Sequence, residues 1–254
     1  MKNPFYDKEF IEKLANFSNG KVEFFEPIVI ISKGSVIKRG YSLAYGFYGG
    51  FKDNVDMNFL KTISKNFFKF YIYDFENKIH ADFLKNKKVF TYILEVPQSI
   101  ENFFKMVSKN RYKSLKKLQN KEKKLNLTIK EGFDFFEEFY ESYKIVYRKH
   151  HKIFKKENIL KLRNYLNLLN VLQNDIYLGG ILIIKIKSYA LLWISGYKNL
   201  LNFDMGEFLF LISVRWAIEN KLEFLDFGLE TTEGVGFIKS SFGTRKYEYN
   251  VWFK

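Results

Sequence analysis

The amino-acid sequence predicts an α/β (or α+β) fold in which mixed sheets are covered by helices. Short apolar runs, typical of buried strands, alternate with longer segments whose apolar residues recur at helical spacing. Glycine and proline separate many of these segments, as they do at turns. With 254 residues, the chain is long enough for one large domain or two smaller ones. The interruption at Pro97 favours two domains, residues 1–96 and 97–254.

The first domain is expected to contain several strands early in the chain, broken by glycines. Its last strand ends before Pro97. In chain order, the expected elements are a helix at 5–18, strands at 22–25, 27–31, 35–38 and 41–47, a helix at 56–67, a strand at 68–73, a short helix at 79–84, and a strand at 89–96.

The second domain is expected to open with a helix, because Ser99 is a favourable N-cap directly after Pro97. The elements that follow end in a hairpin, a helix and further strands. In chain order, they are a helix from 100 to about 120, a strand at 125–130, helices at 133–150 and 158–173, strands at 176–186 and 189–197, a helix at 207–220, and strands at 222–227 and 246–253.

Composition excludes several classes of site. The chain has no cysteine, which rules out disulfides, thiolate catalysis and cysteine-bound zinc. It has three histidines without a spacing typical of metal ligands, so no metal is expected. The net charge of +14 indicates an anionic partner, namely nucleic acid, a nucleotide-bearing substrate or an acidic membrane surface. A codon bias towards Lys, Asn, Ile, Phe and Tyr would also explain part of this charge.

No apolar run approaches the roughly 20 residues needed to cross a bilayer. The first seven residues lack the apolar core of a secretory signal. We therefore expect a cytoplasmic protein, and association with the inner face of the membrane stays open.

The segment 222–243 is the most informative for chemistry. An apolar strand stops at Gly228, turn-prone residues follow, and a short helix is expected to begin at Phe237. This order places Lys239 at the start of a helix beside a loop that can approach a ligand closely. The alternative is an ordinary strand–loop–helix connection with a solvated lysine.

Arg111 is the second unusual residue. It lies within the apolar stripe of the helix at 100–120, whereas Lys109, Lys113, Lys116 and Lys117 point away from that stripe. An arginine in this position must extend to solvent, pair with a carboxylate or bind an anionic ligand. The sequence leaves these three alternatives open.

Four motifs, in this order, resemble the Fem-type peptidyltransferases and the FemAB-like acetyltransferase branch of the GNAT superfamily. They are the basic helix around Arg111, a helix that ends in Arg148, the passage from Ala217 to Gly228, and the string Lys239-Ser240-Ser241-Phe242-Gly243, which is similar to the signature Lys-x-x-Phe-Gly. The resemblance covers about residues 30–250. It implies tandem GNAT-like domains, the first of them reduced.

By this resemblance, the chain is an N-acyltransferase. It would transfer an acetyl, other acyl or aminoacyl group from acyl-CoA or aminoacyl-tRNA to an amine of a cell-envelope sugar or peptidoglycan-type precursor. The donor is a substrate, and no cofactor is bound permanently. Both substrates carry phosphate, and tRNA is a candidate partner.

The resemblance also suggests roles for individual residues. Lys239 would stabilise the charge that develops at the attacked carbonyl, or hold a donor phosphate. Arg148 would contact acceptor phosphates, and Arg111 would contact a ligand or be structural. The other candidates are Asp226, Glu230 or Glu233 as general base, with bracing of the loop as the alternative for Asp226, and Phe237, Phe242 and Gly228 in substrate binding.

The chain departs from the family pattern in three places. Ile238 stands where the family usually has phenylalanine, the helix that ends in Arg148 lacks the threonine that commonly precedes that arginine, and the N-terminal half is short. Ordinary acetyl-CoA enzymes of the superfamily differ from the chain in a further way. The segment Asn202–Glu207 has one glycine and two carboxylates, which makes a poor cradle for the pyrophosphate of CoA. The alternatives to an enzyme are a nucleic-acid-binding protein that uses Lys109–Lys124 and an inactive scaffold with the GNAT fold.

Overall fold

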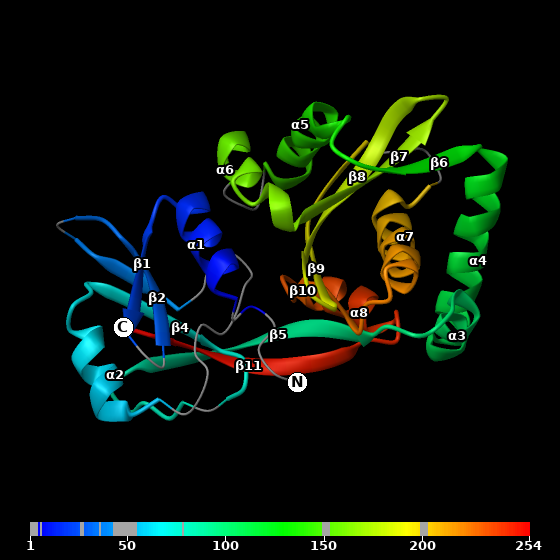
Figure 1. Ribbon diagram of the computed structural model, residues 1–254. Helices are drawn as coiled ribbons and strands as arrows, with labels where there is room; N and C mark the ends of the chain where they lie inside the picture. Colours follow the sequence, from blue (N-terminus) through cyan, green and yellow to red (C-terminus); the bar gives the residue numbers. More distant parts are fainter. Residues whose placement is uncertain are drawn as a thin grey trace. The chain divides into compact units, whose positions relative to one another are not determined.

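The computed structural model describes residues 5, 7–25, 28–35, 37–42, 55–77, 79–148, 153–198 and 203–254. The described chain folds into mixed β-sheet covered by helices (Figure 1). It divides into two compact units. The first comprises Met1–Phe90, Glu157–Arg163 and Tyr247–Lys254, and the second comprises Thr91–Lys156 and Asn164–Lys246.

The first unit has strands in the order β1-β2-β3-β4-β11. Only the pairing of β3 with β4 is parallel among the pairs described in this unit. The strands and helices of this unit are α1 (Lys8–Phe17), β1 (Lys21–Phe25), β2 (Ile28–Lys33), β3 (Arg39–Tyr41), α2 (Met57–Ser64), β4 (Lys69–Asp74) and, shared with the second unit, α6 (Lys156–Leu160) and β11 (Arg245–Phe253).

Side-chain caps fix where the first helices begin. The Asp7 carboxylate accepts the Phe10 N–H at 2.9 Å, and the Asp56 carboxylate caps α2 in the same way. The apolar face of α2 packs on the sheet in a core built from buried aliphatic and aromatic residues. These include Ile28, Ile30, Leu60, Ile63, Phe67, Phe70, Ile72 and Trp252.

The second unit has strands in the order β5-β10-β9-β8-β7-β6, and only β9 and β10 pair in parallel among its described pairs. Its elements are β5 (Lys85–Glu95, shared with the first unit), α3 (Ile100–Met106), α4 (Lys109–Lys124), β6 (Leu127–Glu131), α5 (Phe136–Tyr147), a 3-10 turn (Arg163–Tyr165), β7 (Leu166–Gln173), β8 (Ile176–Ile186), β9 (Tyr189–Tyr197), α7 (Met205–Glu219), β10 (Phe224–Leu229) and α8 (Glu233–Ser240).

In the second unit, α5 and α7 lie on opposite sides of β8 and β9 (Figure 1). Glycines allow both approaches. A Cβ on Gly196 would come 2.5 Å from the Tyr143 nitrogen in α5, and a Cβ on Gly179 would come 3.1 Å from the Met205 Cγ in α7. The α7 side encloses the larger core, which includes Phe103, Leu115, Ile183, Phe208, Ile212, Leu225, Phe227 and Phe242.

The helix predicted at 158–173 is wrong. The chain instead forms α6, the 3-10 turn at Arg163–Tyr165 and the strand β7. Nearly every residue of β7 is buried, because the strand is internal to the sheet. A continuous apolar run of this kind does not distinguish a buried strand from a helix.

The single helix predicted from 100 to about 120 is two helices. Helix α3 ends at Met106, Val107 has extended backbone, and Ser108 begins α4 by accepting the Arg111 N–H at 3.3 Å. Ser99 caps α3, as the sequence predicts. A second N-cap serine inside an apolar stripe is therefore the signal that marks the break.

Three further predictions concern the first unit. No strand forms at 35–38 within the described residues, where β3 starts one residue later. The short helix at 79–84 is wrong, since the segment is a turn held by the Leu84 N–H to Ala81 carbonyl bond. A segment this short cannot stabilise a helix without strong caps. The strand predicted at 41–47 lies mostly outside the described residues.

The hairpin of β8 and β9 has the predicted bounds. Lys187 in its two-residue turn has a φ of 55°, as the tight turns of hairpins require. Among the described helices, none is both long enough and apolar enough to cross a bilayer.

Candidate active site

The parallel strands β9 and β10 part at their carboxyl ends. They are paired from Phe224 and Tyr189 to Asp226 and Leu191. Beyond this point β9 continues against β8, while β10 shifts register against β5 between Asp226 and Leu229. In open α/β sheets, ligands bind at the carboxyl ends of strands where neighbours diverge. This parting is therefore the place in the second unit where a substrate is expected.

Gly228 produces the bend in β10. Its φ is +77°, a conformation that side chains other than glycine rarely adopt. A Cβ here would also lie 3.3 Å from the Leu192 carbonyl oxygen of β9. The sequence prediction that the strand stops at Gly228 is nearly right, because the strand bulges there and ends at Leu229.

Asp226 holds this bend from inside. Its side chain is fully buried. Its Oδ1 accepts the Thr91 hydroxyl at 2.5 Å and the Gly228 N–H at 2.7 Å, and its Oδ2 accepts the Tyr189 hydroxyl at 2.6 Å. A carboxylate with these partners and no access to solvent is placed to brace the bulge. Of the two roles considered from the sequence, these contacts favour bracing.

Lys239 lies in the last turn of α8, and the prediction that it starts a helix is wrong. Helix α8 begins earlier because the Thr232 hydroxyl accepts the Val235 N–H, so that Gly234 and Gly236 are inside the helix. The Lys239 side chain is 6% exposed. Its ammonium donates to the Gly228 carbonyl at 2.9 Å and to the Leu229 carbonyl at 2.7 Å.

Burial lowers the pKa of Lys239 to about 8, although the carboxylates of Asp226 and Glu230 act in the opposite direction. The ammonium is thus a desolvated cation fixed at the bend of β10. A charge in such surroundings interacts strongly with any negative charge that forms beside it.

Glu230 is held by two residues that the sequence analysis missed. Its Oε2 accepts the Tyr92 hydroxyl at 2.6 Å and lies 3.0 Å from the Lys246 ammonium. The hydrogen bonds from Tyr92 and Lys246 lower the pKa of Glu230, and burial together with the bond to Glu230 raises the pKa of Tyr92. A carboxylate with a lowered pKa is a weak proton acceptor, which makes Glu230 a poor general base.

No sequence pattern indicates the pairing of Tyr92 with Glu230, which are 138 residues apart. The strands β5 and β10 bring them together through their antiparallel register. By contrast, Glu233 is exposed in the first turn of α8, where a carboxylate stabilises the helix through its dipole.

The two glycines of α8 differ in their surroundings, and this difference gives a test of the site. A Cβ on Gly236 would come 2.7 Å from the Tyr92 hydroxyl and 2.8 Å from the Glu230 Cδ, whereas nothing lies within 4 Å of a Cβ on Gly234. We expect Gly234→Ala to stabilise α8 by about 0.5–1 kcal/mol. Gly236→Ala should instead separate Tyr92 from Glu230 and destabilise the fold.

Chemical denaturation of the two variants measures this difference. The result that contradicts the arrangement is equal stabilisation by both substitutions, because Gly236 would then have the same free space as Gly234.

Arg111 pairs with a carboxylate. Of the three alternatives that the sequence leaves open (extension to solvent, pairing with a carboxylate, or binding of an anionic ligand), the structure shows the second. Its guanidinium forms an ion pair with Glu207, its Nε donates to the Ser241 Oγ at 2.7 Å, and its Cζ lies 5.1 Å from the centre of the Phe242 ring. Phe242 is fully buried against Phe103 and other aromatic rings. Both residues therefore connect α4 to the end of α8, and Phe242 lies in the core rather than on a substrate-binding surface.

The N-terminus of α7 already carries two carboxylates. The Asp204 Oδ1 accepts the Glu207 N–H at 2.9 Å, and Glu207 is paired with Arg111. A pyrophosphate placed here would meet two negative charges. This arrangement agrees with the sequence-based view that the segment is a poor cradle for CoA.

The remaining candidates lie apart from this network. Arg148 is exposed at the C-terminus of α5, and within the described residues it makes no ion pair with the groups around Lys239. Phe237 lies on α8 two residues before Lys239, and its side chain is 74% exposed. It is therefore free to contact a ligand. His150 and His151 lie outside the described residues.

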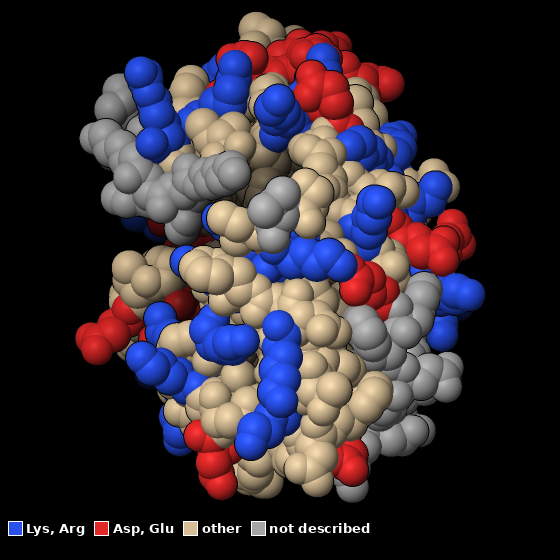
Figure 2. Space-filling view, turned by 90° about the vertical axis from the view of Figure 1, so that its left-hand side faces the viewer, with Lys and Arg blue, Asp and Glu red and all other residues tan. Residues whose placement is uncertain are grey.

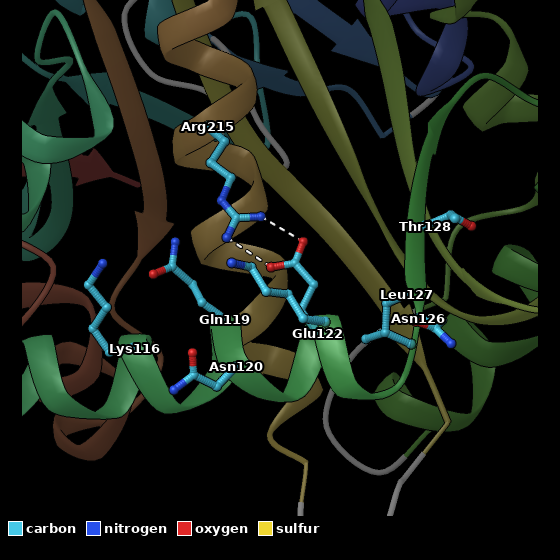
Figure 3. A pocket seen from close by; sticks show the side chains of 9 residues that line it. Lys116, Gln119, Asn120, Glu122, Asn126, Leu127, Thr128 and Arg215 are labelled. Atoms are coloured by element: carbon cyan, nitrogen blue, oxygen red, sulfur yellow. Dashed lines mark hydrogen bonds and ion pairs between the residues drawn. The ribbon is translucent and has the colours of Figure 1, made fainter.

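A separate polar groove of ≈ 790 Å³ lies between α4, β6 and α7 (Figure 3). Figure 3 shows Arg215 of α7 turned towards Glu122 of α4, and their two hydrogen bonds are 2.7 and 2.9 Å long. Lys116 and Lys123 also line it, but none of the residues around Lys239 does. The groove is the surface available to the alternative function in nucleic-acid binding. No group of three or more His, Asp or Glu side chains that could hold a metal occurs in the described part of the chain.

Solved structures share this fold. The C-terminal domain of a protein assigned as a lysylphosphatidylglycerol synthetase from Agrobacterium fabrum aligns with a TM-score of 0.68 and 10% identity, covering 95% of this chain and 86% of that one. FemX aligns with a TM-score of 0.65 and 12% identity, covering 94% and 90%. L-PGS from Bacillus licheniformis aligns with a TM-score of 0.68 and 11% identity, covering 99% and 87%.

These likenesses confirm the predicted Fem/GNAT-like fold, and at such low identity they show the fold alone. No family model and no curated protein matches the sequence.

Proposed function

We propose that this protein is an acyltransferase that moves an aminoacyl or other acyl group from an activated donor to an amine. One observation carries the proposal: the buried Lys239 ammonium is fixed where β9 and β10 part. The Fem/GNAT-like fold supports it, since FemX, L-PGS and the domain assigned to a lysylphosphatidylglycerol synthetase are similar to this chain over 94–99% of its length.

The reaction assigns one step to Lys239. The acceptor amine attacks the carbonyl carbon of the donor ester, and the new C–N bond places negative charge on the carbonyl oxygen. A lysine ammonium has three N–H donors, and the carbonyls of Gly228 and Leu229 accept from two of them. The third stabilises the oxyanion. The C–O bond to the donor then breaks, and the proton that the amine nitrogen loses passes to the departing oxygen, so that an amide and a free donor hydroxyl are formed.

The residues around the bend of β10 explain what keeps the Lys239 ammonium in this position. Asp226 fixes the bend of β10 by accepting the Gly228 N–H. The Gly228 and Leu229 carbonyls at this bend then accept hydrogen bonds from the Lys239 ammonium. Because Asp226 is buried and Glu230 has a lowered pKa, neither is suited to take the proton of the amine. The acceptor amine therefore enters the site unprotonated.

We propose an aminoacyl ester, such as aminoacyl-tRNA, as the donor in preference to acyl-CoA. The two carboxylates at the N-terminus of α7 oppose a pyrophosphate. For the acceptor, we propose an amine on a cell-envelope sugar or peptidoglycan-type precursor, as the resemblance to Fem-type enzymes implies.

Mass spectrometry after incubation with each donor tests this function. The protein is mixed with aminoacyl-tRNA or acetyl-CoA and with amino-sugar or peptide acceptors. We expect saturable transfer from aminoacyl-tRNA and little from acetyl-CoA. If RNA binds without turnover, and binding weakens steeply as salt rises, the nucleic-acid-binding alternative is correct instead.

The pH dependence of transfer follows from the lowered pKa of Lys239. Its ammonium donates to the oxyanion only when protonated, so kcat is expected to fall as pH rises through about 8. Deprotonation of the acceptor amine acts in the opposite direction and gives the acidic limb of a bell-shaped profile. Stopped assays between pH 6 and about 10 check this, and a rate that keeps rising beyond pH 9 contradicts the role of Lys239.

A further inference from the structure

The first unit exposes two large apolar side chains on neighbouring segments. Ile37 is 59% exposed and Phe68 is 66% exposed. The Phe68 N–H donates to the carbonyl of Lys38 at 2.8 Å, which brings the two segments into contact. Single exposed apolar residues are common on protein surfaces, but adjacent ones indicate an interaction site.

Phe68 stands among buried phenylalanines. Phe67 and Phe70 are buried in the core of the first unit, at 2% and 0% exposure. Phe68 directly precedes β4, in which Phe70, Ile72 and Asp74 are the buried residues. Its exposure therefore does not follow from the alternation of the strand, because position 68 has the same parity as these buried residues.

Basic residues surround this apolar pair. Arg39 of β3 and Lys69 of β4 are directly opposite each other in the parallel register. Like charges in that position destabilise a sheet. Lys65 follows the C-terminus of α2, and Lys38 lies 3.7 Å from Glu23.

No carboxylate among the described residues pairs with Arg39, Lys65 or Lys69. We name the six exposed residues the basic–apolar edge: Ile37, Lys38, Arg39, Lys65, Phe68 and Lys69. Figure 2 faces the side on which α2, β1 and β2 lie at the left of Figure 1, and Lys and Arg side chains stand there among uncharged surface.

We propose that the basic–apolar edge docks on an anionic phospholipid bilayer. Ile37 and Phe68 enter the boundary between headgroups and acyl chains, and the surrounding cations meet lipid phosphates. An aliphatic side chain favours hydrocarbon over nucleic acid, since Ile37 has no ring on which a base could stack. The charges of Arg39 and Lys69, which no carboxylate in the described part of the chain pairs with, complement the bilayer surface. This docking is independent of the acyltransferase activity.

Vesicle co-sedimentation tests the proposal with the full chain. Phosphatidylcholine vesicles are compared with vesicles in which a third of the lipid is phosphatidylglycerol. We expect binding to the anionic vesicles alone, weaker at high salt. The double variant Ile37→Ser/Phe68→Ser should weaken binding roughly tenfold, because apolar insertion is lost.

The charge variant Arg39→Gln/Lys69→Gln should weaken binding by roughly thirtyfold, since each cation near an anionic bilayer contributes about fivefold. Two control variants leave the basic–apolar edge intact. Ile176→Ser removes an apolar side chain that is 62% exposed on β8, and Lys113→Gln/Lys117→Gln removes two exposed cations from α4. Both controls should bind like the wild type.

Circular dichroism spectra of each variant are compared with that of the wild type to check that the variant is folded. The proposal is overturned if the wild type does not bind anionic vesicles, if either edge variant binds as tightly as the wild type, or if the α4 variant loses as much binding as the edge charge variant. In the last case the charge of the whole molecule, and not this surface, would account for binding.

Discussion

Replacing Asp226 with alanine is expected to destabilise the second unit by about 3 kcal/mol or more, because each buried donor left without a partner costs about 1–3 kcal/mol. Three donors are affected: the hydroxyls of Thr91 and Tyr189 and the N–H of Gly228. Asp226 is fully buried, so water cannot replace the missing carboxylate without rearrangement. The melting temperature should fall by roughly 6–12 °C.

Two controls make this measurement specific. Asp226→Asn keeps an oxygen that can accept from Thr91 and Gly228, and the Tyr189 hydroxyl can rotate to accept from the new amide. We expect it to lose less than half as much stability. Glu141→Ala removes a carboxylate that is 65% exposed in α5 and should change stability by less than about 0.5 kcal/mol. An Asp226→Ala protein as stable as the wild type would show that the bend of β10 does not depend on this carboxylate.

The fold class could be predicted because its strongest signals are local. Two apolar runs separated by a two-residue turn at Lys187 predict the hairpin of β8 and β9 with the correct bounds. Strand β7 is wrongly predicted as part of a helix, because its sequence lacks the alternation that marks most strands. It is internal to the sheet, so both of its faces are buried and its apolar run has no period of two.

The candidate site was predictable only in part. The motif around Lys239 and Gly228 is contiguous, and the sequence therefore identified both residues. The contacts that hold them come from strands far away in the chain, as with Thr91, Tyr92 and Tyr189. Tyrosines in apolar strands are ordinary core residues by composition, and only the register of β5, β9 and β10 gives these three a polar partner.

Replacing Lys239 with methionine is expected to lower kcat for acyl transfer by about 100- to 1000-fold, the usual effect of losing one donor to an oxyanion. Methionine has a similar length and keeps the site filled, but it donates no hydrogen bond. Because the third N–H acts on the oxyanion and not on the bound substrate, KM should change little. Steady-state kinetics of the two proteins provides the comparison.

Lys239 also bonds two carbonyls of the β10 bend, so a structural contribution has to be separated from a chemical one. Lys239→Arg does this. An arginine stays protonated throughout the accessible pH range, and the decline in kcat near pH 8 should disappear in this variant even where its activity is reduced. Lys246→Gln is the matched control, because Lys246 is 45% exposed and contacts Glu230 instead of the bend; its pH profile should keep the decline. If Lys239→Arg also keeps the decline near pH 8, another group titrates there, and Lys239 only supports the shape of β10.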